Sequence, residues 1–202
     1  VYSNAKHQSA STSTVCMSKI DFALHTAPYQ VALKQSPNIL WQQVQLHYPS
    51  TVACPFQSTQ IYDFMPRVTS PRWSSHYQFQ IGNQHFRQCR ADELFPVFEW
   101  GLNWLVSSFC LNYLCIHAAV LAKGEQALIF PAPPGSGKST LCALLMLQGW
   151  RLLSDEHCLV DLETAAIIPC VRPISLKNRS IEVISDYAPQ LQPLPRYANT
   201  VK

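Results

Sequence analysis

The sequence predicts an α/β fold in which a domain with a mixed β-sheet follows a β-rich N-terminal lobe. Residues 19–98 are rich in β-forming residues, Gln and Pro, whereas helical and strand-like apolar patterns alternate from residue 99 onward. A glycine-containing turn at residues 135–137 lies between an apolar strand pattern and an apolar helix pattern. We therefore expect a lobe at 19–98 and an α/β domain at 99–202 that is incomplete at its C-terminal end.

The composition is that of a globular protein. The 202-residue chain is 48% hydrophobic and 13% charged, with a net charge of +3. Lys and Arg form no cluster, so we expect no nucleic-acid partner. The eight cysteines include no CxxC pair, which favours reduced core thiols over a zinc site or a disulfide framework.

Two segments bear on localisation. Residues 1–18 are rich in Ser and Thr and lack a signal-peptide pattern, so we interpret them as a disordered tail. Residues 100–122 carry no charge and are long enough to cross a bilayer, but their helical periodicity changes to a strand-like one. We predict a core helix followed by a core strand, and hence a cytoplasmic protein without membrane contact.

Local signals place the expected elements. In the lobe, Ser36 is a candidate N-cap with Pro37 in the first helical position, residues 60–64 form a strand pattern, and a hairpin is expected to turn at residues 82–83. In the second domain we expect helices at 99–114 and 138–148, strands at 116–121, 127–130 and 150–153, a hairpin of 158–160 with 165–168, and a Pro-rich loop after residue 169.

The turn before the second helix resembles a phosphate-binding loop. Glycines at 135 and 137 allow backbone N–H groups to point at phosphate oxygens, at the positive end of the following helix. A lysine ammonium and a serine hydroxyl follow in the positions that bind the β- and γ-phosphates and Mg²⁺. The pattern departs from the usual one at Ala132, where a glycine is common. The candidate nucleotide-binding residues are Pro134, Gly135, Ser136, Gly137, Lys138, Ser139 and Thr140.

Three side chains are candidates for the chemistry. Asp155 and Glu156 follow the strand after the loop helix, where a carboxylate can hold Mg²⁺ or accept a proton. His117 lies on the strand expected to pair with the loop-bearing strand, and a core histidine is the plainer interpretation from the residues alone. Ser139, Asp155 and Glu156 are the candidate Mg²⁺ ligands.

Three segments together, IHAAVL, GSGKST and GWRLLSDE, resemble the catalytic domain of the HPr kinase/phosphorylase family. The resemblance covers residues 60–202 and is strongest to the branch called HPr-kinase-related kinase A, with segments similar to FEWGLNW, LLSDE and RPISLKN. It implies a PEP carboxykinase-like fold with a phosphate loop. It also implies that a complete member continues beyond Lys202.

The resemblance implies roles residue by residue. Asp155 matches the aspartate that deprotonates the acceptor hydroxyl, and Glu156 matches the second acidic residue, which we assign to the metal or its surroundings. His117 matches a histidine near the reacting phosphate, and Ser139 matches the Mg²⁺ ligand. Pro134 stands where the parent family has a serine.

We therefore expect an ATP- and Mg²⁺-dependent kinase that transfers the γ-phosphoryl group to a hydroxyl of a protein serine or a small metabolite. Arg172 and Lys177 are candidate contacts for phosphate or acceptor, with solvated loop cations as the alternative. A small-molecule kinase of another type and a non-catalytic nucleotide-binding module stay open, as does a homo-oligomer. The sequence does not identify the acceptor.

Overall fold

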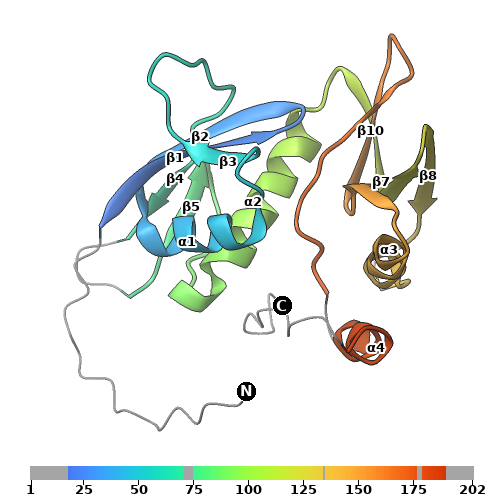
Figure 1. Cartoon of the computed structure of the whole chain (residues 1–202). Helices are drawn as coiled ribbons and strands as arrows, with labels where there is room; N and C mark the ends of the chain where they lie inside the picture. The colour runs from blue at the N-terminus through green and yellow to red at the C-terminus, as the bar shows by residue number, and fades with distance from the viewer. Residues whose placement is uncertain (1–17, 71–74, 134, 177–178, 190–202) are drawn as a thin grey trace, which may run out of the picture.

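Figure 1 shows the computed structural model of the chain, which describes residues 18–70, 75–133, 135–176 and 179–189. The described part is a mixed α/β structure with three sheets, and all pairings between its named strands are antiparallel. The α/β class is confirmed. The mixed strand directions expected for the second domain do not occur among the described strands. The predicted tail lies outside the described residues, apart from Ser18.

The first sheet has the order β2-β1-β3 and carries one helix. Its elements are β1 (Lys19–Thr26), β2 (Tyr29–Pro37), α1 (Asn38–His47) and β3 (Ala53–Pro55). The helix packs with Leu40, Trp41 and Val44, which lie on one face. The predicted cap at Ser36 is wrong by one residue, because β2 continues through Pro37 and the helix begins at Asn38.

The second small sheet has the order β4-β5-β6 and packs against the longest helix. Its elements are β4 (Arg67–Thr69), β5 (Gln78–Ile81), β6 (Gln84–His85), the 3-10 turn η1 (Ala91–Glu93) and α2 (Leu94–Phe109). The predicted hairpin at Gly82-Asn83 is confirmed. Helix and strand approach closely at Gly101, where a Cβ atom would lie 2.1 Å from the Phe79 ring.

The third sheet has a long central strand, β7 (Tyr113–Lys123), which pairs with β10 and β9 on one side and with β8 on the other. Its other elements are β8 (Gln126–Pro131), α3 (Lys138–Leu147), β9 (Arg151–Ser154), β10 (His157–Asp161) and β11 (Ile167–Ile168). The helix α3 carries the chain from β8 to β9 on the other side of β7, so β8 and β9 run in the same direction but are not neighbours. Each of them pairs with β7 in the antiparallel sense.

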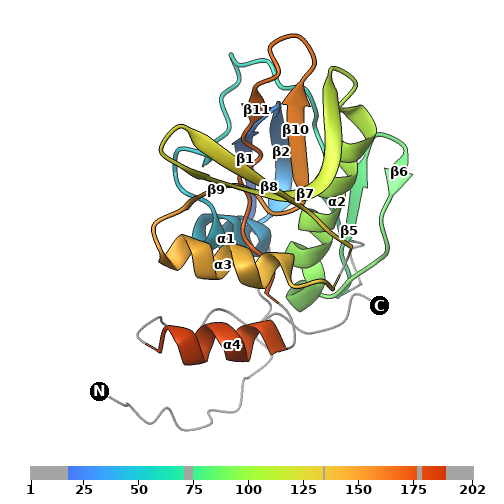
Figure 2. The same ribbon diagram turned by 90° about the vertical axis from the view of Figure 1, so that its right-hand side faces the viewer.

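Figure 2 shows α3 across one face of this sheet, with α4 (Arg179–Tyr187) beside it. Ala119, Leu121 and Cys142 form the core between sheet and helix. Helix α4 lies in the segment after Pro169 that we predicted as loop, so that prediction is wrong for residues 179–187. Ile184 is the buried residue of this helix.

Two further predictions differ from the structure. Residues 60–64 form no regular strand, and only Phe64 makes an isolated bridge, to Val31. The helix predicted at 99–114 begins at Leu94 and ends at Phe109, so the predicted domain boundary after residue 98 falls inside α2.

Helix α2 carries two apolar faces, and only one of them is fully buried. Trp100 and Phe109 are half exposed, whereas Phe98, Leu102 and Leu105 are fully buried. Among the described residues, no helix is long and apolar enough to span a bilayer.

Candidate functional site

The loop between β8 and α3 has the backbone conformation that the glycine pattern predicts. Gly135 has a φ of 81° and Gly137 a φ of 94°, both in the left-handed region that residues with a Cβ rarely adopt. A Cβ would meet no atom within 4 Å at either position, so backbone conformation, not space, requires glycine here. Pro134 lies outside the described residues.

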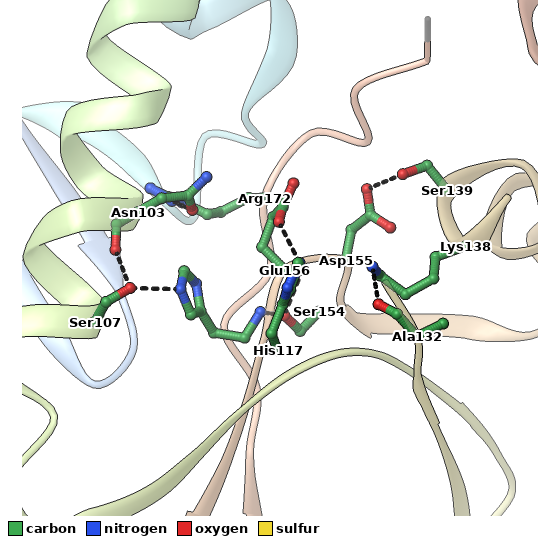
Figure 3. Close-up of polar contacts among 11 residues, drawn as sticks. Asn103, Ser107, His117, Ala132, Lys138, Ser139, Ser154, Asp155, Glu156 and Arg172 are labelled. Atoms are coloured by element: carbon green, nitrogen blue, oxygen red, sulfur yellow. Dashed lines mark hydrogen bonds and ion pairs between the residues drawn. The ribbon is translucent and has the colours of Figure 1, made fainter. Parts of the chain in front are cut away.

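Lys138 is the first residue of α3, and its side chain turns back over the loop. Its Nζ donates a hydrogen bond of 2.8 Å to the carbonyl oxygen of Ala132, as Figure 3 shows. An ammonium has three donors, so this contact leaves two for a ligand. The helix α3 begins with N–H groups that have no acceptor within the helix, which adds a partial positive charge at the same place.

Ser139 and Asp155 meet beside this lysine. The Ser139 hydroxyl donates a hydrogen bond of 2.9 Å to Oδ2 of Asp155. Asp155 is 5% exposed, and its Oδ1 is buried without a hydrogen-bond partner among the described residues. Burial raises the pKa of Asp155, the Ser139 hydrogen bond lowers it, and the Glu156 charge raises it. Because Oδ1 has no hydrogen-bond partner among the described residues, a cation could join it.

Glu156 belongs to a different environment, although it follows Asp155 directly. Its Oε2 lies 3.2 Å from Nε2 of His117, and both side chains are about half exposed. The Ser154 hydroxyl accepts hydrogen bonds from the backbone N–H groups of Glu156 and His157, at 3.3 and 3.0 Å. This turn directs the two neighbouring carboxylates to separate partners, as Figure 3 shows. The expected pairing of the His117 strand with the loop-bearing strand is confirmed.

His157 is a site neighbour that the sequence did not indicate. It pairs with His117 across β7 and β10, and its Nε2 lies 2.8 Å from the Ser107 hydroxyl. Ser107 donates its own proton to the carbonyl of Asn103, so His157 Nε2 is the donor and Nδ1 carries no proton. Burial, and after it the Arg172 charge, lower the pKa of His157 to about 4. His157 is therefore neutral at pH 7.

Arg172 is buried against helix α2. Its side chain is 6% exposed, forms an ion pair of 3.8 Å with Glu99 and donates a hydrogen bond to Asn103. Tyr48 donates a hydrogen bond of 2.7 Å to the same Glu99 carboxylate. Arg172 thus pairs with a buried carboxylate of α2, and its role as a phosphate contact stays a prediction. Lys177 lies outside the described residues.

Thr140 contacts α4. Its hydroxyl lies 2.7 Å from the Ser180 hydroxyl, and Gln148 at the other end of α3 donates a hydrogen bond of 3.0 Å to Tyr187. Two polar contacts therefore hold α4 along α3, so the Thr140 side chain already has a partner. The hydroxyl of Thr140 is available to a ligand only if it leaves Ser180.

The chemistry of these donors suits a phosphate-bound metal better than a metal held by protein alone. Among the described residues, no group of three or more His, Cys, Asp and Glu could hold a metal ion. Ser139 and Asp155 supply two oxygen ligands, which is the number Mg²⁺ uses when nucleotide phosphates and water complete its shell. The seven described cysteines have free thiols.

Comparisons of the chain with protein-family models, with curated proteins and with solved structures found no match.

Proposed function

We propose that this protein binds ATP with Mg²⁺ and transfers the γ-phosphoryl group to a hydroxyl, with a PEP carboxykinase-like site of the HPr-kinase type. The observation that carries the proposal is the Ser139–Asp155 pair at the base of a loop with two left-handed glycines. A buried carboxylate with one free oxygen is costly unless a cation joins it. Mg²⁺ on triphosphate oxygens is the cation that the surrounding loop favours.

Each loop residue has a task in this proposal. The N–H groups around Gly135 and Gly137 and at the start of α3 would hold phosphate oxygens, and Lys138 would exchange the Ala132 carbonyl for the β- and γ-phosphates. Ser139 and Asp155 would hold Mg²⁺, which would supply positive charge to the β- and γ-phosphates.

The geometry leads us to assign proton transfer to Glu156 and His117 in place of Asp155. A carboxylate that holds a cation is a weak base, because the positive charge stabilises its deprotonated form. Glu156 is accessible and faces His117 at 3.2 Å, so the pair can take the proton of an incoming hydroxyl. The acceptor oxygen then bonds to the γ-phosphorus, the bond to the β–γ bridging oxygen breaks, and ADP leaves.

A transfer assay tests this proposal. We would incubate the chain with γ-labelled ATP, Mg²⁺ and separate pools of hydroxy amino acids, sugars and small serine-containing proteins. The proposal predicts label on one class of acceptor with the parent chain and none with the Lys138→Ala variant. Equal labelling by both would contradict the site assignment. Full Mg·ATP binding without transfer in any pool would contradict the kinase assignment and favour a binding module.

A further inference from the structure

The pairing of β1 with β2 contains a bulge close to the start of the chain's described part. Ile20 faces Ser36 and Phe22 faces Leu33, so Asp21 alone lies opposite the two residues Lys34 and Gln35. Gln35 has a φ of 53°, which is unusual for a residue other than glycine. Its N–H donates a hydrogen bond of 2.7 Å to Oδ1 of Asp21, which holds the bulge in place.

The bulge borders a cavity of about 440 Å³ between the β1–β2 end and β4. Three cationic side chains line it, those of Lys19, Lys34 and Arg67, together with Thr69 and Ser70. None of the described residues that line it carries a carboxylate. The cavity therefore combines three positive charges with hydroxyl groups, and bulges of this kind commonly redirect side chains beside binding sites.

The three cations have no charge partner among the described residues. Every ion pair of the described chain involves other side chains. Lys34 Nζ lies 4.6 Å from the centre of the Phe56 ring, a cation–π contact that does not neutralise its charge. Asp21, the acidic residue of the bulge, already uses one oxygen on the Gln35 N–H. Lys19, Lys34 and Arg67 are exposed, so water screens part of their mutual repulsion, and an anion bound in the cavity would relieve the rest.

We propose that this cavity binds a small oxyanion with two or more negative charges, as a site separate from the nucleotide loop. Its volume is in the range of small-molecule sites. Two ammonium groups and a planar guanidinium fork suit a phosphate ester or a polycarboxylate. Figure 1 shows the start of β1 far from α3, so this binding does not depend on the proposed ATP site.

The test uses inorganic pyrophosphate and citrate as probes, titrated calorimetrically into the whole chain carrying Lys138→Ala. That background removes the main phosphate ligand of the other site, so a failure here is distinct from a failure of the kinase proposal. We expect one bound anion per chain. Adding Lys34→Ala and Arg67→Ala should weaken its affinity by roughly tenfold or more. Binding of pyrophosphate alone identifies a phosphate site, whereas binding of both probes identifies a general polyanion site.

The matched control adds Lys123→Ala and Arg151→Ala, which remove two exposed cations from the other domain. It should keep the affinity of the Lys138→Ala chain. Amide chemical shifts provide a second measurement and should move at Gln35 and Thr69 on adding pyrophosphate. If both added pairs of substitutions weakened anion binding equally, the effect would be one of general charge and the proposal would be overturned. So would millimolar pyrophosphate that produces neither heat nor shifts at these residues.

Discussion

The Ser139 hydroxyl donates a hydrogen bond of 2.9 Å to Asp155, which links the first turn of α3 to the residue after β9. The next residue, Glu156, turns to His117 instead, at 3.2 Å. Two adjacent carboxylates thus have different partners and different exposure. This division is the basis for assigning Asp155 to the metal and Glu156 to the proton.

The first prediction concerns Asp155→Asn. The amide oxygen can still accept the Ser139 hydrogen bond, so the loop should keep its shape, but the charge facing the metal is lost. Loss of a residue that merely orients a metal ligand typically lowers metal affinity about 10- to 100-fold. Asp155 is proposed as a direct ligand, so its loss should lower the Mg²⁺-dependent ATP affinity by at least roughly that factor. Calorimetry at low and high Mg²⁺ measures it. High Mg²⁺ should partly restore binding, and an unchanged Mg²⁺ dependence would contradict the assignment.

The second prediction concerns Glu156→Gln. The variant should bind Mg·ATP like the parent chain, because Glu156 does not contact the Ser139–Asp155 pair. Transfer to the acceptor should slow by roughly 10²- to 10⁴-fold, the usual contribution of a general base. Single-turnover assays with saturating nucleotide separate the two effects. If transfer persists here and disappears in Asp155→Asn at saturating Mg·ATP, the base is Asp155, as the family resemblance implied.

Much of this site could be predicted from local sequence. The strand, the glycine pattern and the helix are close in the chain, so the loop, α3 and the pairing of β7 with β8 follow from short-range rules. The fate of Arg172 could not be predicted that way. Its partner Glu99 lies 73 residues earlier on α2, and nothing near Arg172 in sequence reveals a buried carboxylate.

The histidine next to the acidic pair was missed for a similar reason. His157 is positioned by Ser107, 50 residues away, and by its pairing opposite His117. Helix α2 was misplaced because its sequence offers two apolar stripes, and only packing against β5 selects the one that includes Phe98. Short-range patterns define elements, whereas long-range packing decides which polar groups become partners.

The third prediction is a pH dependence of stability. The folded-state pKa of His157 is about 4, below its ordinary value of 6.5, so the unfolded chain binds its proton more readily. Stability from this residue is full above pH 6.5 and is lost as the pH falls toward 4. His157→Gln keeps a donor for Ser107 without titrating. Urea unfolding at pH 7 and 4.5 should show the parent losing roughly 2–3 kcal/mol more than the variant. Equal losses would contradict a buried neutral imidazole.

The fourth prediction concerns the buried ion pair. Arg172→Met leaves the Glu99 carboxylate without its cation and should cost about 3–5 kcal/mol of unfolding free energy. Adding Glu99→Gln should recover part of that loss, since the unpaired charge disappears. Urea denaturation measures both. If Arg172 acts only through this ion pair, the ATP affinity of the folded variants should equal that of the parent. A large loss of affinity without a loss of stability would instead support Arg172 as a phosphate contact.

The central claim is that the loop around Lys138 binds a nucleoside triphosphate, and one measurement tests it most directly. Calorimetric titration of Mg·ATP into the parent chain, Lys138→Ala and the exposed-lysine control Lys123→Ala compares two equal losses of charge. Lys138 alone should face the β- and γ-phosphates, so Lys138→Ala should weaken binding by roughly tenfold or more, while Lys123→Ala binds like the parent. Equal affinity in all three chains, or no binding to the parent, would contradict the account.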